Sequence, residues 1–187
     1  MRTFIAIKIV PEKKLIDLVA TLKKSLNNEI INWADPDNLH LTLRFIGETE
    51  QKQVAETMRF LEEVAQRFNP FQFSLKNVGF FKSKNQPRIL FFAIENGLVL
   101  NQLAAEIEER IVALGFSREE RLFNPHLTIG RIKFIQNKMV FYDLINQFKG
   151  TEIQKVTVSE IVYYQSILTS SGAIYKPLKI ISLKNLE

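Results

Sequence analysis

Apolar residues along the chain follow two alternating periods, one typical of β-strands and one typical of α-helices. Short runs rich in Ile, Val and Phe alternate with longer segments in which apolar residues recur every three or four positions. The helical segments carry their apolar residues on a single stripe, so each is expected to bury one face against a sheet. The strand-like runs cover residues 2–10, 39–46, 71–81, 88–95 and 126–134, and the helical segments cover residues 11–27, 50–68, 98–115 and 139–148.

The order of these elements repeats along the chain. A strand, a helix, a second strand and a second helix occur in the first half and again, in that order, in the second half. We therefore predict one bilobal domain over residues 1–187, with similar lobes at about 1–85 and 86–187 related by a pseudo-twofold axis. Residues 153–183 are predicted to form a closing hairpin, with its turn at Ser170-Ser171-Gly172.

The alternation of strands and helices is common in parallel, doubly wound sheets. Here no Gly-rich phosphate loop follows the first strand, and several strands alternate polar and apolar residues enough to leave one face in water. We therefore predict an α+β fold in which antiparallel sheets line a central groove and the helices pack outside.

A tetrapeptide, His-Leu-Thr followed by an aliphatic residue, occurs at residues 40–43 and again at residues 126–129, 86 positions later. The chain contains only two histidines, and each begins one copy. Because side chains alternate across a strand, His and Thr share one face and the two aliphatic residues share the other. We expect the aliphatic residues to be buried and the His and Thr pairs to line the groove.

Two histidines that face each other suit general acid-base catalysis, because imidazole exchanges protons near neutral pH. One neutral imidazole can take a proton from water while a protonated one gives a proton to a leaving oxygen, as an in-line displacement at phosphorus requires. The hydroxyls of Thr42 and Thr128 are candidates to hold phosphoryl oxygens. Strand parity places Arg44 on the face of His40, whereas Arg131 requires a β-bulge at Gly130 to join that face.

Other kinds of site fit the sequence less well. A metal centre would have two neutral imidazoles and neither His-x-x-x-His nor His-Glu-x-x-His spacing, and a serine hydrolase would lack the Gly-x-Ser-x-Gly elbow. We expect no metal and no cofactor. The pairs Phe80-Phe81 and Phe91-Phe92 offer rings for base stacking, although core packing is the expected role of most of the 15 Phe.

Composition limits the class of protein and its location. The absence of cysteine excludes a disulfide framework and a thiol nucleophile, and it fits a reducing compartment. No signal-peptide pattern or membrane-length apolar stretch occurs, so we expect a cytoplasmic protein with no membrane partner. We also expect it to be a monomer. A net charge of +5 favours an anionic partner such as RNA.

The sequence resembles the two-histidine (2H) phosphoesterases, and among them the RNA 2′,3′-cyclic phosphodiesterases of LigT type, formerly called 2′-5′ RNA ligases. The resemblance covers nearly the whole chain, and its specific part is the pair of His-x-Thr-x motifs. The residues that carry it are Arg2-Thr3-Phe4-Ile5-Ala6-Ile7, Trp33, Asn38-Leu39-His40-Leu41-Thr42-Leu43-Arg44-Phe45-Ile46-Gly47-Glu48, Gly79-Phe80-Phe81, Pro87-Arg88-Ile89-Leu90, Phe123-Asn124-Pro125-His126-Leu127-Thr128-Ile129-Gly130-Arg131, Tyr164-Gln165-Ser166, Gly172 and Tyr175.

This resemblance implies hydrolysis of a terminal 2′,3′-cyclic phosphate on RNA to a 2′-phosphate, without a metal ion. It implies that His40 is the proton donor to the departing 3′-oxygen and that His126 is the base that activates water. It also implies that Thr42, Thr128 and Arg131 are phosphate ligands, which favours Arg131 over Arg44. Two alternatives remain open, namely 2′-5′ RNA ligation in the same site and a non-catalytic module that binds RNA ends.

Overall fold

In the computed structural model, which describes residues 1–170 and 172–184, the chain forms two antiparallel sheets and four α-helices. The helices are α1 (Lys13–Ser25), α2 (Gln51–Ala65), α3 (Leu98–Ala113) and α4 (Lys138–Gln147), with a 3₁₀ turn at η1 (Pro36–Asn38). The strands are β1 (Arg2–Lys8), β2 (Ile30–Trp33), β3 (His40–Glu48), β4 (Phe71–Ser83), β5 (Gln86–Glu95), β6 (His126–Phe134), β7 (Glu152–Val158), β8 (Glu160–Thr169) and β9 (Gly172–Ser182).

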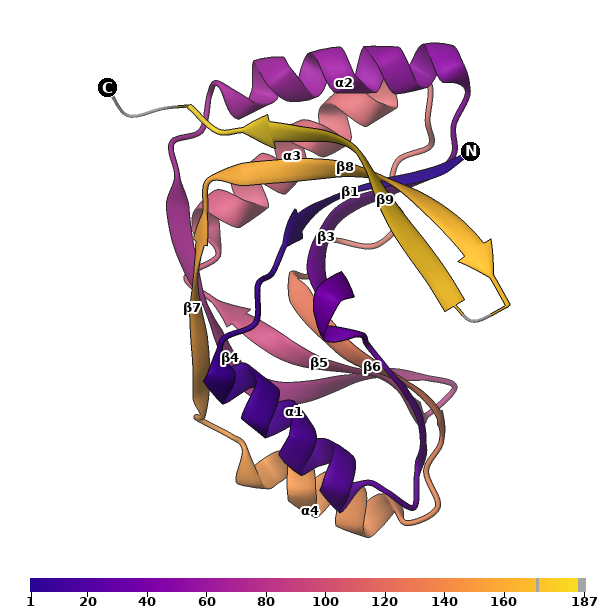
Figure 1. Ribbon diagram of the computed structural model, residues 1–187, viewed down its shortest axis with the longest axis vertical. Coiled ribbons are helices and arrows are strands. Elements are labelled where there is room, and N and C mark those ends of the chain that lie inside the picture. The colour runs from indigo at the N-terminus through magenta and orange to yellow at the C-terminus, as the bar shows by residue number, and fades with distance from the viewer. Residues whose placement is uncertain (171, 185–187) are drawn as a thin grey trace.

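The two sheets carry helices on their outer faces, as Figure 1 shows. The four-stranded sheet, in the order β3-β1-β8-β9, packs against α2 and α3, and the five-stranded sheet, in the order β2-β6-β5-β4-β7, packs against α1 and α4. Every pair of neighbouring strands is antiparallel. The predicted α+β class and the placement of the helices are therefore confirmed.

One apolar core joins the helices to the outer faces of both sheets. Each helix contributes its predicted stripe, for example Leu22 of α1 and Ile107 of α3, and both are fully buried. The aliphatic residues of the two motifs, represented by Leu41 and Leu127, lie in the same core. The His and Thr side chains of each motif therefore lie on the opposite, less buried face of the strand. None of the described helices combines the length and apolar character needed to cross a membrane.

Sheet membership does not follow the boundary expected near residue 85. Strands β2 and β4 come from the first half of the chain but lie in the five-stranded sheet, while β8 and β9 from the second half complete the four-stranded sheet. Strand β2 was not predicted, because four residues are too few to show a period. Each sheet is thus built from both halves of the chain.

The closing hairpin differs in part from its prediction. The segment expected as one strand from residue 153 divides near Ser159 into β7, which pairs with β4, and β8, which pairs with β1. The hairpin consists of β8 and β9 alone, paired from Glu160 with Ser182 to Thr169 with Gly172. Of the predicted turn, Ser171 lies outside the described residues.

Each motif strand contains an extra residue at the fourth position of the motif, and β3 has a second one at Ile46. In β3, Thr42 pairs with Ala6 and Arg44 with Ile5, so Leu43 is unpaired. In β6, Thr128 pairs with Phe91 and Gly130 with Leu90, so Ile129 is unpaired. A bulge of this kind places two consecutive residues on one side of the strand and reverses the parity of those that follow.

The bulge in β3 shows that simple parity was wrong for Arg44. Its side chain is on the buried side of the strand, 7% exposed, and its guanidinium is bound by Glu108 of α3 and by Glu119. The same guanidinium donates hydrogen bonds of 2.6 Å to the Ser117 carbonyl oxygen and 2.7 Å to that of Phe45. Arg44 therefore fastens β3 to α3 and to the loop that leads to His126.

We expect Arg44→Gln to lower the free energy of unfolding by about 3 kcal/mol, because it leaves Glu108 and Glu119 without their cation. Urea denaturation followed by circular dichroism measures the change. The triple variant with Glu108→Gln and Glu119→Gln should regain part of the loss, since no unpaired carboxylate remains. Arg131→Gln is the matched control, because that arginine is exposed and should change stability by less than about 0.5 kcal/mol. Equal stability of the two single variants would contradict the structural role of Arg44.

Candidate active site

The two histidines begin β3 and β6 and are held by the same kind of hydrogen bond. His40 Nδ1 lies 2.6 Å from the carbonyl oxygen of Asn38, and His126 Nδ1 lies 2.7 Å from that of Asn124. A carbonyl oxygen only accepts, so each Nδ1 carries the proton and donates it. The other nitrogen, Nε2, is then free in both rings to accept or donate a proton to a ligand.

Aromatic rings fix the plane of each imidazole. The His40 ring lies 4.9 Å from the ring centre of Tyr175 and 5.1 Å from that of Phe4. The His126 ring lies 4.8 Å from the ring centre of Phe81 and 5.4 Å from that of Phe91. Each histidine is half-buried among these rings, which restricts rotation of its side chain and limits its contact with water.

These contacts separate the roles of the four paired phenylalanines. Phe92 is fully buried and Phe80 packs against Phe141, so both serve the core as expected. Phe81 and Phe91 stack on each other at 4.2 Å and lie beside His126. The sequence offered a signal for this difference, because the two residues of each Phe-Phe pair are consecutive, and consecutive residues of a strand lie on opposite faces.

Burial lowers the pKa of His40 below the usual value of about 6.5, because the surroundings disfavour the charged imidazolium. The hydrogen bond to Asn38 opposes this shift, and the positive charge of Arg131 adds to it. Arg131 belongs to β6 in the other sheet, and β3 and β6 lie in contact. The cation of one motif strand therefore acts electrostatically on the histidine of the other.

The polar face of β6 combines Thr128 and Arg131 with His126. The bulge at Ile129 reverses the parity, so the structure meets the condition that sequence analysis set for Arg131. Thr128 is half-buried and Arg131 is exposed, and no carboxylate in the described part of the chain pairs with this guanidinium. A hydroxyl donor and an unneutralised arginine on one face are suited to bind a phosphate.

The polar face of β3 combines Thr42 with His40 but has no matching arginine. The position equivalent to Arg131 is Phe45, which is 42% exposed and lies 5.5 Å from the Arg2 guanidinium carbon. Beside His40 there is a cavity of about 140 Å³ with Tyr164 and Tyr175 among its lining residues. Sequence analysis named neither tyrosine as a site residue, because both belong to the closing hairpin, far along the chain from the motifs.

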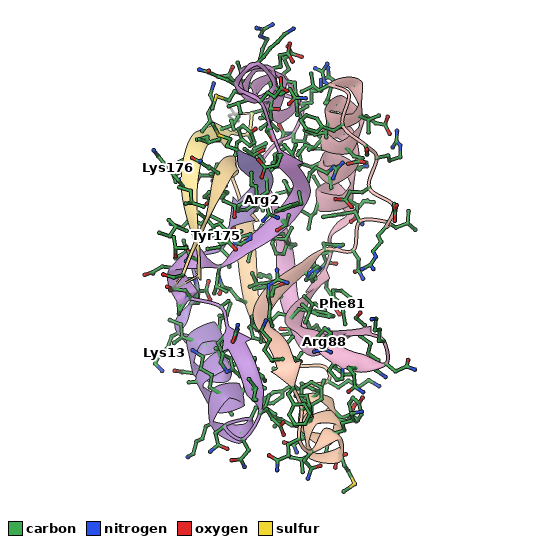
Figure 2. All side chains as sticks on the ribbon, turned by 90° about the vertical axis from the view of Figure 1, so that its right-hand side faces the viewer. Arg2, Lys13, Phe81, Arg88, Tyr175 and Lys176 are labelled. Atoms are coloured by element: carbon green, nitrogen blue, oxygen red, sulfur yellow. The ribbon has the colours of Figure 1, made fainter. Side chains whose placement is uncertain are left out.

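Tyr175 and Phe81 can be placed in Figure 2, which looks onto the right-hand side of Figure 1. Tyr175 lies on the side of the four-stranded sheet and Phe81 on the side of the five-stranded sheet. The two aromatic groups that hold His40 and His126 thus come from the two sheets. Within residues 1–170 and 172–184, no group of three or more His, Cys, Asp or Glu side chains is arranged to hold a metal ion.

Comparisons with known proteins agree with this arrangement. Residues 7–91 and 95–175 match the family described as LigT like phosphoesterase. A protein of Methanocaldococcus jannaschii named RNA 2′,3′-cyclic phosphodiesterase is 34% identical over 180 residues, which cover 96% of this chain and 99% of that protein. A protein of the same name from Thermotoga maritima is 36% identical, and the match covers 95% of this chain and 93% of the relative.

Solved structures share the fold over the whole chain. The protein TT0787 of Thermus thermophilus superimposes with a TM-score of 0.80 at 20% identity and covers both chains completely. E. coli LigT complexed with 3′-AMP superimposes with a TM-score of 0.75 at 23% identity and covers 98% of each chain. The predicted family resemblance is confirmed by the family match and by relatives above 30% identity. This chain belongs to the LigT-like phosphoesterase family.

Proposed function

We propose that this protein hydrolyses the 2′,3′-cyclic phosphate at the end of an RNA to a 2′-phosphate, by acid-base catalysis without a metal ion. The observation that carries the proposal is the pair of histidines on two motif strands that contact each other across the two sheets, each with Nδ1 bound to a carbonyl oxygen and Nε2 free. The names of the relatives from Methanocaldococcus jannaschii and Thermotoga maritima support the cyclic phosphodiester as substrate.

The reaction requires one base and one acid on opposite sides of phosphorus. His126 Nε2 takes a proton from water as the water oxygen forms its bond to phosphorus. His40 Nε2–H gives a proton to the 3′-oxygen as the bond between phosphorus and that oxygen breaks. The products are a 2′-phosphate and a 3′-hydroxyl. His40 is left neutral and His126 protonated, and proton exchange with water restores both.

Charge on the phosphoryl oxygens grows as the water attacks. Thr42 and Thr128 donate hydrogen bonds to these oxygens, and the Arg131 guanidinium stabilises their negative charge. Arg44 has no part in this step, because its guanidinium is held by Glu108 and Glu119 on the buried side of β3.

The lowered pKa of His40 gives substrate binding a role in preparing the acid. In the free enzyme burial and Arg131 both favour neutral His40. A bound phosphate anion offsets the charge of Arg131 and attracts a proton to His40, which raises its pKa. The proton donor therefore forms when the substrate is in place.

We expect His40→Ala and His126→Ala each to lower kcat by about 10²- to 10⁴-fold, the usual contribution of a general acid or base. The assay is incubation with RNA that ends in a 2′,3′-cyclic phosphate, followed by identification of a 2′- or 3′-phosphate product. Unchanged circular dichroism and thermal unfolding in each variant would show that the fold is intact.

Four results, from this assay and from variations of it, would overturn the proposal. Full activity in His126→Ala would end the paired-histidine mechanism. Loss of activity with EDTA and its return with zinc would indicate a metal centre. A 2′-5′ linked product formed with 5′-hydroxyl RNA, in place of hydrolysis, would indicate a ligase, and tight binding of the cyclic end without turnover would indicate a binding module.

We expect the pKa of His40 in the free enzyme to lie below about 6.5 and to rise in Arg131→Gln, since the substitution removes a neighbouring positive charge. NMR titration of the imidazole signals measures it directly, and the chain contains only two histidines, so His126→Ala assigns the signals. Addition of adenosine 2′-monophosphate should also raise this pKa. The kcat/KM value, which requires protonated His40, should fall as pH rises through the pKa of the free enzyme. A His40 pKa that is unchanged in Arg131→Gln would contradict the coupling between the sheets.

A further inference from the structure

The exposed side of β6 carries positive charge beyond Arg131. Lys133 follows two positions later, and Arg88 of the neighbouring strand β5 donates a 2.9 Å hydrogen bond to the Lys133 carbonyl oxygen. Both side chains are exposed, while Ile132 and Pro87 next to them are buried. The strand register places Arg88 beside the exposed end of β6. Ile89 pairs with Arg131 of β6, and Arg88, the next residue toward the start of β5, has no pairing partner on β4.

No carboxylate in the part of the chain that the structure describes neutralises these two cations, which lie side by side on adjacent strands. Some other arginines do pair with acidic side chains, for example Arg67 with Glu106 and Arg118 with Glu109. No ion pair involves Arg88 or Lys133 within residues 1–170 and 172–184. Arg88 uses one of its five N–H groups for the Lys133 carbonyl, which anchors the side chain and leaves its other donors for a ligand.

The other motif strand, β3, has no counterpart to this positive row. A shift of 86 positions relates the two motifs, and it aligns Arg131 with Phe45 and Lys133 with Gly47. Phe45 itself is contacted by a cation from another strand, because the guanidinium of Arg2 lies over its ring. A polyanion that runs along a motif strand from its histidine therefore meets unpaired positive charge on β6, whereas the one cation of β3, Arg44, is bound by Glu108 and Glu119.

The distance along β6 suits one nucleotide. Residues two apart on a strand are separated by about 7 Å, which is comparable with the length of one sugar-phosphate unit of an extended RNA. Figure 2 shows Arg88 close to Phe81, the ring that packs against His126. A phosphate one nucleotide away from the histidines is thus within the region that Arg88 and Lys133 occupy.

We propose that Arg88 and Lys133 form a second phosphate site, which holds the internucleotide phosphate next to the terminal cyclic phosphate. The RNA chain then leaves the catalytic site along β6, past Arg131, over the five-stranded sheet. This inference rests on the proposed function and extends it. It names an oligoribonucleotide with a cyclic end, and not a nucleoside cyclic phosphate, as the preferred substrate.

The experiment compares two substrates that differ by one internucleotide phosphate. The first is a nucleoside 2′,3′-cyclic phosphate, and the second is a dinucleotide that ends in the same cyclic nucleotide. In the wild type, kcat/KM should be higher for the dinucleotide. In Arg88→Gln and in Lys133→Gln, the ratio of the two kcat/KM values should fall by about five- to tenfold, which is typical when one charge-assisted hydrogen bond is removed. The slope of log kcat/KM against log salt for the dinucleotide should decrease by about 0.7 for each phosphate that the variant no longer binds.

Two variants serve as controls. Lys82 lies on the same hairpin as Arg88, but its ammonium lies 5.5 Å from the ring of Tyr142 on α4, so Lys82→Gln should leave the ratio unchanged. Arg2→Gln tests the opposite path over the four-stranded sheet. A fall of the ratio in Arg2→Gln, with none in Arg88→Gln or Lys133→Gln, would overturn the proposed direction of the RNA chain.

The design also separates failure of this inference from failure of the proposed function. If the wild type hydrolyses both substrates at equal kcat/KM and the Arg88 and Lys133 variants keep that ratio, the second site is disproved while the phosphodiesterase activity stands. If the wild type hydrolyses neither substrate, the proposed function itself fails.

Discussion

The extra residue in each motif strand decides which side chains face the site. Leu43 in β3 and Ile129 in β6 are unpaired in their ladders, and each reverses the alternation that His and Thr follow at the start of the motif. Without the bulge in β6, Arg131 would lie on the apolar face among core residues, where an unpaired guanidinium is costly. Without the bulge in β3, the Arg44 side chain would point to the opposite face of the strand, away from Glu108 and Glu119. The bulges therefore supply both the exposed cation of one sheet and the buried ion pairs of the other.

The same bulge has different consequences because the next residue differs. In β3 that residue is Arg44, whose long side chain reaches α3 and the loop at residues 117–119. In β6 it is Gly130, and a Cβ added there would lie 2.9 Å from the Ile31 side chain and 3.5 Å from the Trp33 ring. Strand β2 can pair closely beside β6 only because this position has no side chain. The position after the bulge thus carries a clamp to a helix in β3 and a close strand contact in β6.

Much of the fold follows from the sequence because the helical stripes and the motif strands are local patterns. All four helices and both motif strands occur within a few residues of their predicted limits, as α2 illustrates. The partition into sheets could not be predicted in this way, because β2 and the division near Ser159 depend on pairing between distant segments. For the site, the repeat identified both histidines. Parity failed at Arg44 because the first motif strand has no glycine next to its bulge at Leu43, whereas Gly130 indicated the bulge in the second. The rings of Phe4 and Tyr175 were missed for the same reason as the sheet partition, since they reach His40 only through pairing of β1, β8 and β9.

The two copies keep the same imidazole geometry but not the same electrostatics, and this difference gives the site a direction. Both Nδ1 atoms donate to a carbonyl two residues earlier, so the rings present Nε2 alike. Only β6 carries an arginine on the polar face, and its charge adds to the burial that lowers the pKa of His40 on the opposite strand. A perfectly symmetric pair would have equal proton affinities and no preference for which histidine gives its proton. Because the charge of Arg131 disfavours protonation of His40, neutralisation of Arg131 by an anion, such as the phosphate of the proposed substrate, would favour the imidazolium at His40. An arginine that only one of the two motif strands presents on its polar face is therefore sufficient to tie the protonation of His40 to occupation of the proposed site.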